Sequence, residues 1–517
     1  MNLDDMRTYD DDEIVDVVVV GTGAGGAPLL AELAGRGLHV VALEAGRNFG
    51  LRDFTPDENE AVRINWMSER LSGGEDPTAF GPNNSGMGVG GSTLHWGAFA
   101  PRPDRRDLRL RTETGEGRDW PVDPEELLGY IRRVERDIGV SGPTPYPWDA
   151  ERTYDQPAPA RNAPADIVAR GAASVGLRTA DAPAAVLTRA RLQPHAGERG
   201  ACVSCGACHQ GCRFGAKATT ATTYLPAAVA AGAEIRPESM VHGIELDARG
   251  RVSAVVYRRD GVDRRQRCRT LVLAGGGVET PRLLLHTGLA NSSGQVGRNF
   301  LAHGATQVWG RFDEALRGYR GYPSSLISED MLRPADADFA GGYLLQSLGV
   351  MPLTFATTLA RGGGLWGRDL VDGVLNARFY AGIGINGECL PSEANRLELV
   401  DETDEWGMPR ARVTFTAGPN EKALDRHATA LMLDVMRAAG ARDTMVLART
   451  AHTVGTARMS TDASDGVVDA DGRSHDIPNL WISDNSVFPS ALAANPAPTI
   501  MAMSLRTAAR MLAASGH

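Results

Sequence analysis

The feature that most constrains this chain is a glycine-rich turn that follows an apolar run near its N-terminus. Residues 17–20 are four consecutive valines, a pattern typical of a buried parallel strand. Gly21, Gly23 and Gly26 come next with the spacing G-x-G-x-x-G, and residues 24–36 form an Ala/Leu-rich helical run. Such glycines permit the tight turn, the close approach of backbone to a pyrophosphate, and close packing of helix on strand. The order predicts a βαβ unit that binds an adenine dinucleotide.

An acidic residue completes this unit. Residues 39–43 form a second buried strand, which ends at Glu44. A carboxylate at the tip of that strand is placed to accept hydrogen bonds from ribose hydroxyls, and the helix N-terminus favours the pyrophosphate. The negative charge of Glu44 disfavours a 2′-phosphate, so the motif points to NAD or FAD rather than NADP and does not separate these two.

Length and charge exclude several other classes. A chain of 517 residues is long enough for two intimately mixed domains. The formal net charge is −10 and the arginines are scattered, which argues against nucleic acid as a partner. The acidic N-terminus lacks the apolar core of a signal peptide, and no stretch is apolar for long enough to span a membrane. We therefore expect a cytoplasmic protein with no membrane span.

Two distant segments carry a resemblance to a known family. Residues 89–96 read V-G-G-S-T-L-H-W, and residues 451–459 read A-H-T-V-G-T-A-R-M. Residues 469–512 continue with a strand that ends at Asp484, the pair Asn495-Pro496 and a helical run. Together they resemble the glucose–methanol–choline (GMC) oxidoreductases, flavoproteins that oxidise alcohol groups, and are most similar to pyranose oxidases and glycoside 3-oxidases.

The resemblance and the pattern of apolar runs predict an α/β fold, α+β overall, in two parts. The first is a Rossmann-like FAD-binding domain built discontinuously from residues 1–104, 200–304 and 447–517. The second is a substrate domain with a peripheral insert, residues 105–199 and 305–446, whose strand-like segments predict an antiparallel sheet backed by helices. Within it, the Gly-rich segment 355–369 is predicted to be a mobile loop that covers the substrate.

The resemblance also implies which residues contact FAD. A second strand–glycine–helix unit at residues 271–281 and the C-terminal segment favour FAD over NAD. The last helix, expected to begin at Thr499, would point its N-terminus at the flavin. The implied FAD contacts are Gly21, Gly23, Ala24, Gly25, Gly26, Glu44, Ala45, Gly90, Ser92, His95, Trp96, Gly97, Ala98, Val241, Ala274, Gly275, Asp484, Asn485, Asn495, Pro496 and Thr499.

His95 has two alternative roles. It falls on the position whose histidine is bonded to the flavin 8α-methyl group in pyranose oxidases. Other relatives keep a histidine there without that bond, and we favour the noncovalent contact.

His452 and Asn495 are the predicted catalytic pair. Oxidising an alcohol removes a hydride from carbon and a proton from oxygen, and the flavin takes the hydride at N5. The proton needs a base that works near neutral pH, which suits an imidazole. The resemblance places His452 on the active-site histidine and Asn495 on its partner. We expect His452 to be the base and Asn495 to hold the hydroxyl; the alternative for His452 is a hydrogen-bond donor.

A run of four cysteines leaves three alternatives open. Cys202, Cys205, Cys208 and Cys212 have the spacing of a bacterial ferredoxin run, whose thiolates hold an iron–sulfur cluster. Arg213 stands where that run has proline, and no second run exists. The alternatives are metal-free thiols, which we favour, an iron–sulfur cluster, and zinc held by four sulfurs.

The sequence therefore predicts an FAD-dependent oxidoreductase that converts a secondary hydroxyl of a sugar or glycoside to a ketone and is reoxidised by O2. One rival is a dehydrogenase that passes electrons to a quinone or a partner protein, with the cysteine run as an iron–sulfur relay. A second rival is a lyase that keeps FAD without reducing it.

Overall fold

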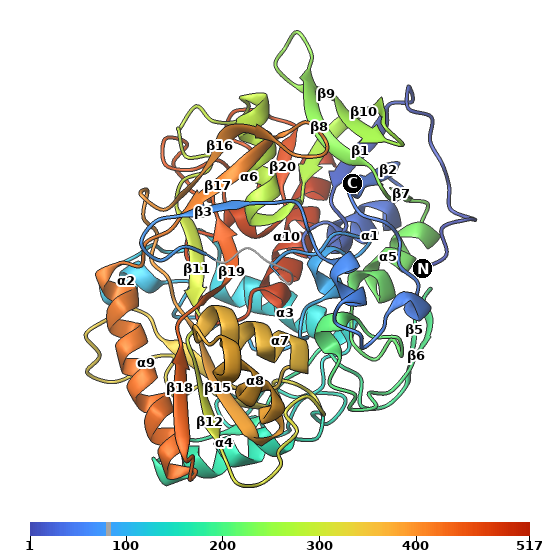
Figure 1. Ribbon diagram of the computed structural model, residues 1–517. Coiled ribbons are helices and arrows are strands. Elements are labelled where there is room, and N and C mark those ends of the chain that lie inside the picture. Colours follow the sequence, from blue (N-terminus) through green and yellow to red (C-terminus); the bar gives the residue numbers. More distant parts are fainter. Residues whose placement is uncertain (79–83, 517) are drawn as a thin grey trace.

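The computed structural model describes residues 1–78 and 84–516 (Figure 1). Its first sheet contains the predicted βαβ unit. Strands β7, β2, β1, β10 and β20 lie in that order and run parallel, which is the doubly wound arrangement of nucleotide-binding folds. The N-terminal half of β10 leaves this layer and pairs antiparallel with β9, which pairs with β8. The strands are β1 (Val15–Val20), β2 (Val40–Leu43), β7 (Glu234–Arg236), β8 (Met240–Leu246), β9 (Val252–Arg259), β10 (Val262–Leu273) and β20 (Leu480–Ile482).

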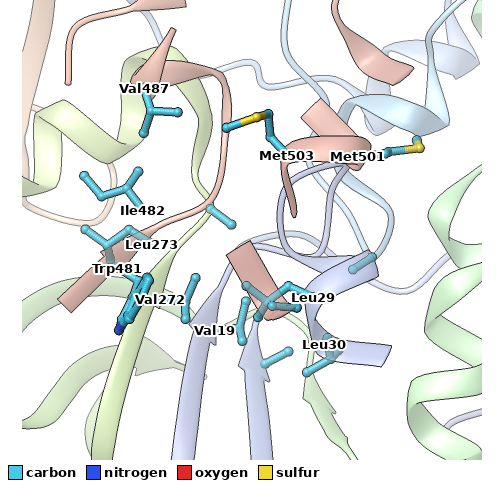
Figure 2. Close-up of a cluster of buried hydrophobic side chains, with 14 of the residues drawn as sticks. Val19, Leu29, Leu30, Val272, Leu273, Trp481, Ile482, Val487, Met501 and Met503 are labelled. Carbon is cyan, nitrogen blue, oxygen red and sulfur yellow. The ribbon is translucent and has the colours of Figure 1, made fainter. Parts of the chain in front are cut away.

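The first sheet is buried because helices cover its parallel part. Helix α1 (Ala27–Gly35) packs against α5 (Tyr224–Ala230) and α10 (Ala497–Ser515), and α10 packs against α3 (Pro124–Ile138). Figure 2 shows the resulting core, in which strand residues such as Val19 and Val272 lie near Leu29 of α1. This burial explains why the parallel strands read as continuous apolar runs.

A second sheet lies beside the first, its strands pair antiparallel, and helices cover both of its faces (Figure 1). Helices α4 (Ala163–Ser174) and α9 (Pro419–Ala438) pack together and against strands β12 and β15, and the apolar faces of these elements form a separate core. The strands of this sheet are β4 (Ala180–Asp181), β11 (Phe300–Gly304), β12 (Gln307–Arg311), β13 (Leu326–Ser328), β14 (Tyr343–Leu348), β15 (Tyr380–Gly387), β18 (Asp443–Leu447) and β19 (Thr450–Gly455).

Two smaller sheets and four further α-helices complete the described fold. A three-stranded sheet combines β3 (Leu71–Gly73), β16 (Arg396–Thr403) and β17 (Pro409–Thr414), and a hairpin combines β5 (Arg191–Gln193) and β6 (Gly197–Arg199). The remaining α-helices are α2 (Leu110–Thr114), α6 (Gly276–Thr287), α7 (Pro352–Thr357) and α8 (Gly367–Leu375). Among the described residues no helix is both long and apolar enough to cross a membrane.

The predicted fold class is confirmed, with two local corrections. The Gly-rich segment 355–369 is largely helical rather than a loop: α7 continues into a π-helical turn, Thr358–Gly362, and after residues 363–366 α8 begins at Gly367. Phe355 and Leu359 bury themselves in a small apolar cluster, and this packing outweighs the low helix propensity of the glycines. The last helix begins at Ala497 rather than Thr499, because the fixed φ of Pro498 suits a first helical turn.

Candidate active site

A β-bulge places His452 in the site. In the pairing of β11 with β19, Ala302 faces Thr453 and His303 faces Ala451, so His452 is an extra residue without a partner in the ladder. Its φ of +51° lies in the left-handed region, which is uncommon for a residue other than glycine. Bulges re-aim side chains and are frequent next to active sites. Here the bulge turns the His452 imidazole toward His303 on the neighbouring strand.

The two imidazoles are linked through their Nδ1 atoms, which lie 3.2 Å apart. The Nε2 atom of His303 lies 3.0 Å from the Ala491 carbonyl oxygen and 2.6 Å from the Leu492 carbonyl oxygen. Because carbonyls only accept, His303 carries its proton on Nε2 and its Nδ1 is the acceptor. His452 must then donate from Nδ1, which leaves the lone pair of His452 on Nε2.

Two asparagines lie on the other side of His452. The Asn495 side-chain nitrogen is 3.3 Å from His452 Nε2, so the amide donates to the free lone pair. The Asn495 side-chain oxygen accepts from the Asn386 Nδ2 atom at 3.1 Å. The second contact fixes which end of the Asn495 amide faces the imidazole, because only the nitrogen end can donate.

Electrostatics keep both imidazoles neutral. Burial lowers the pKa of His303 to about 4, although its two carbonyl contacts act in the opposite direction. Burial, and then the charges of His303 and Arg449, hold the pKa of His452 well below its usual value. Over the ordinary pH range His452 therefore presents an unprotonated Nε2, which is the form that a base requires.

The glycine turn forms the predicted βαβ connection. A Cβ on Gly25 would lie 1.9 Å from the Ser483 carbonyl oxygen, so only glycine fits beside the end of β20. The Glu44 carboxylate is buried and accepts from the Thr22 hydroxyl at 2.8 Å and from the Gly46 N–H at 3.0 Å. Burial raises the pKa of Glu44, and these hydrogen bonds oppose that rise.

Three consecutive residues, 483–485, connect this turn with the strand of His452. The Ser483 hydroxyl donates to the Gly25 carbonyl at 2.8 Å, and the adjacent Asp484 accepts from the Gly276 N–H at 2.8 Å. Asn485 donates to the Thr453 carbonyl at 2.6 Å, one residue beyond His452. The predicted nucleotide turn and the predicted catalytic histidine, more than 400 positions apart in the sequence, therefore belong to one site.

His95 lies in a buried cluster of cationic and imidazole groups. Its Nε2 atom is buried without a hydrogen-bond partner among the described residues, and its carbonyl contacts His209 Nδ1 at 3.1 Å. The Lys217 ammonium donates to the carbonyls of Leu94 and Trp96 at 2.8 and 3.0 Å. Burial, with the charge of Lys217, lowers the pKa of His95 to about 3, so this imidazole is also neutral.

The cysteine run lies beside this cluster. Lys217 also donates to the Cys208 carbonyl at 2.7 Å, and burial raises the pKa of the Cys208 thiol to about 12. Within residues 1–78 and 84–516, no three His, Cys, Asp or Glu side chains are arranged to hold a metal ion. All four cysteines of the run are free thiols, and Cys205 is exposed.

The other predicted FAD contacts surround the same region. The Trp96 indole donates to the Ala218 carbonyl at 2.8 Å, Ala98 has a φ of +61°, and Val241 is buried on β8. Pro496 caps α10, and the Thr499 hydroxyl is buried without a partner among the described residues. The orphaned atoms Thr499 Oγ1 and His95 Nε2 fit a polar ligand such as the flavin ring system, because buried polar atoms ordinarily have partners.

Sequence reasoning missed His303 and Asn386. His303 falls in segment 200–304 of the predicted FAD-binding domain and Asn386 in segment 305–446 of the predicted substrate domain, and neither residue was assigned a role from the sequence. Neither stands in a motif of recognisable spacing, and only the pairing of β11 with β19 and β15 brings them to the site. Two other histidines are held elsewhere: His427 contacts the Tyr343 hydroxyl at 2.8 Å, and His475 the Ser460 carbonyl at 3.1 Å.

A separate cavity of about 850 Å³ opens away from this group. Residues 116–121 and 458–462 form much of its wall, and neither His452 nor Asn495 lines it. Two of its arginines, Arg118 and Arg458, are both paired with Asp465.

The doubly wound sheet, its glycine turn and the histidine–asparagine group fit a flavin-dependent oxidoreductase. Comparison with known proteins agrees: two sequence models of the GMC oxidoreductase family match residues 78–305 and 391–504. The chain belongs to the GMC oxidoreductase family. It is therefore an FAD-dependent enzyme that acts on CH–OH donors.

Several curated relatives extend over nearly the whole chain. The 2-methyl-1,2-propanediol dehydrogenase of Mycolicibacterium austroafricanum is 30% identical over 95% of this chain and 94% of the relative. The fructose dehydrogenase large subunit of Gluconobacter japonicus is 29% identical over 96% and 97%. The paromamine 6′-oxidase of Streptomyces fradiae is 28% identical over 98% and 92%.

Solved structures share the fold at low sequence identity. A formate oxidase from Aspergillus oryzae superposes with a TM-score of 0.72 at 15% identity, covering 98% of this chain and all of that one. The pyridoxine 4-oxidase of Mesorbium loti gives a TM-score of 0.68 at 16% identity, covering 97% of this chain and all of that one.

Proposed function

We propose that this enzyme oxidises a hydroxyl group of a sugar or glycoside, with His452 as the base. The observation that carries the proposal is the chain of contacts from the Ala491 and Leu492 carbonyls through His303 to His452, which leaves a lone pair on His452 Nε2. The sequence resemblance favours a secondary hydroxyl, and the relatives include enzymes named for fructose and for paromamine.

Each residue of the site has a distinct role in the proposed reaction. Bound FAD would supply the hydride acceptor that the oxidation of an alcohol requires. His452 would accept the hydroxyl proton at Nε2, and the Asn495 side-chain nitrogen, 3.3 Å from that atom, would donate to the same hydroxyl oxygen. Asn386 fixes the Asn495 amide, and His303 keeps the His452 proton on Nδ1.

The FAD contacts predicted from the sequence are part of this proposal. Gly21 to Gly26 and Glu44 would bind the ADP half, and residues 90–98 with Thr499 would bind the flavin. We assign FAD binding to residues 1–104, 200–304 and 447–517, and substrate binding to 105–199 and 305–446.

We propose that His95 contacts the flavin without a covalent bond. Attack by a ring nitrogen of His95 creates positive charge on a ring whose pKa burial and Lys217 already lower to about 3. Precipitation with acid should leave the yellow colour in the supernatant. Colour that stays in the washed pellet would show a covalent bond instead.

Anaerobic flavin reduction tests the proposed function. The panel contains D-fructose, methyl β-D-glucopyranoside, 2-methyl-1,2-propanediol and benzyl alcohol, and the bleaching of the yellow colour is followed by stopped flow. Replacing His452 with Ala should slow bleaching by about 100- to 10,000-fold, as expected for loss of a general base. Bleaching at the wild-type rate would refute the assignment. If no panel member bleaches the wild type while FAD is bound, the lyase alternative gains support.

The electron acceptor is a separate part of the proposal. We propose O2, as the sequence resemblance to oxidases favours, and mixing the bleached enzyme with aerated buffer tests it. A dehydrogenase is the second candidate, favoured by two relatives that are named dehydrogenases. Reoxidation by a soluble quinone but not by air would select it. We propose that the cysteine run is metal-free, and iron and zinc analysis of the purified protein tests this.

A further inference from the structure

A buried carboxyl group lies directly behind the histidine pair. Glu388 follows β15, two residues after Asn386, and its Oε1 atom accepts from the Leu492 N–H at 2.9 Å and the Cys389 N–H at 3.0 Å. Its Oε2 atom is buried without a hydrogen-bond partner among the described residues. The side chain is about 1% exposed, so this carboxyl group is sequestered from solvent.

A second carboxylate completes the arrangement. Asp107 accepts from the Ala493 N–H at 3.3 Å through Oδ2, and its Oδ1 atom lies 2.5 Å from Arg333 Nη2. Glu388 and Asp107 thus receive the N–H groups of consecutive residues, Leu492 and Ala493. Leu492 has a φ of +66°, which for a residue other than glycine marks an unusual backbone that the surroundings must hold in place.

The same two peptide groups bind His303 through their other ends. The peptide between Ala491 and Leu492 offers its carbonyl to His303 and its N–H to Glu388. The peptide between Leu492 and Ala493 offers its carbonyl to His303 and its N–H to Asp107. Hydrogen bonds in series polarise one another, so a negative charge on the N–H side makes each carbonyl a stronger acceptor.

We propose that Glu388, with Asp107, sets how readily the His303–His452 pair takes up a proton, acting through these two peptide groups. The inference rests on the proposed function, because it concerns the base of that reaction. Glu388 touches neither imidazole directly and is a positioning residue. The charge of Arg449 disfavours a proton on His452, and among the described residues no carboxylate contacts either imidazole to stabilise the proton that His452 receives.

The charge of the Glu388 carboxyl group changes near pH 8. Burial, and next the charge of Asp107, raise the pKa of Glu388 to about 8, and the Arg333 charge and the peptide N–H groups oppose them. Burial also raises the pKa of Asp107, against the charge of Arg333 and with that of Asp104. The titratable groups facing Glu388 are therefore Asp107, Arg333 and the Cys389 thiol, with Asp104 behind Asp107.

Loss of the Glu388 proton should make His452 a stronger base. Below about pH 8, Glu388 holds a proton and the peptide groups feel little added charge. Above it, the new negative charge strengthens the Ala491 and Leu492 carbonyls as acceptors and stabilises a protonated histidine pair. The base becomes stronger, and alcohol oxidation should speed up as pH rises through about 8.

The test uses the FAD-bound enzyme and the variant Glu388→Gln, whose amide oxygen can still accept the Leu492 N–H. The matched control is Glu398→Gln, an exposed residue of β16 that pairs with Arg396. The flavin reduction rate is measured anaerobically across pH with the panel compound that reduces the wild type fastest. The wild type and control should show a step near pH 8. Glu388→Gln should match them below the step and fall about threefold to tenfold behind above it.

A second readout needs no substrate. Infrared difference spectra of the oxidised wild type should show the C=O band of a protonated carboxyl group that disappears as pH rises through about 8. The band should shift when the protein contains [δ-¹³C]glutamate, which separates Glu388 from Asp107, and it should be absent from Glu388→Gln. This measurement applies even if the variant folds poorly, because the wild type alone can show that the band is absent.

Two results would overturn the inference: a pH step that persists in Glu388→Gln, or no glutamate carboxyl band in the wild type. An equal loss of rate at every pH would also contradict it and would indicate a purely structural role. Failure of the proposed function looks different. In that case the panel does not bleach the wild-type flavin, or His452→Ala is bleached as fast as the wild type, whatever Glu388 does.

Discussion

The Nδ1 atoms of His303 and His452 lie 3.2 Å apart at a bulge between β11 and β19. Because the backbone carbonyls of Ala491 and Leu492 require a proton on His303 Nε2, this contact determines the tautomer of His452. An imidazole held in one tautomer is ready to accept a proton at a defined atom.

Replacing His303 with Ala should slow flavin reduction by about 100-fold, because His452 can then hold its proton on Nε2 and lose the lone pair that faces the substrate. Stopped-flow bleaching measures the effect. The expected loss is in the limiting rate rather than in apparent substrate affinity. His475→Gln is the control, since that side chain contacts the Ser460 carbonyl instead. Equal rates in the His303 variant and the control would contradict the tautomer argument.

Asn495→Ala should lower the limiting rate of flavin reduction by about 10- to 100-fold, because the substrate oxygen loses its donor and is no longer oriented. Asn495→His should restore part of the rate, since a histidine can also donate there. Asn386→Ala should have a smaller effect in the same direction, because it frees the Asn495 amide to turn. An Asn386 variant that is slower than Asn495→Ala would mean that Asn386 has a more direct role.

Acid should destabilise the fold through its buried histidines. The folded pKa is about 3 for His95, about 4 for His209 and about 4 for His303, all below the ordinary value of 6.5. Between about pH 6.5 and pH 4 the unfolded chain therefore binds more protons, and stability falls as pH falls. Each such histidine contributes a slope of about 1.4 kcal/mol per pH unit.

Thermal unfolding across this pH window measures that slope. His209→Gln should make the decline shallower by roughly one proton, since that position no longer takes up a proton on unfolding. His475→Gln again serves as the control. An unchanged slope in His209→Gln would show that His209 is already protonated in the folded protein.

Gly25→Ala should prevent FAD binding or folding, because its Cβ would lie 1.9 Å from the Ser483 carbonyl oxygen, which is backbone and cannot move aside cheaply. Gly129 in α3 is a matched control: nothing lies within 4 Å of its added Cβ. Gly129→Ala should leave flavin content unchanged and stabilise the protein by about 0.5–1 kcal/mol. The ratio of flavin to protein absorbance and the melting temperature report both results. Normal flavin content in Gly25→Ala would contradict the packing argument.

Much of the fold could be predicted from local sequence patterns. The valine run and glycine turn predicted the β1–α1–β2 unit. These elements follow from contacts close in sequence, such as strand burial, caps and helix periodicity. The prediction of a loop over residues 355–369 was wrong for a related reason. Its glycines are typical of a loop, whereas the burial of Phe355 and Leu359 depends on strands far away in the chain.

The sequence by itself determined that the chain has a dinucleotide-type turn, an α/β fold and the residues His452 and Asn495 as a candidate pair, because each stands in a short motif with its own spacing. Tertiary structure alone decided that His303 and Asn386 join them, and that Glu388 and Asp107 lie behind. The physical reason is that a bulge and a strand pairing bring together side chains whose separation in sequence carries no periodic signal. The tautomer of His452 is therefore a property of the folded chain.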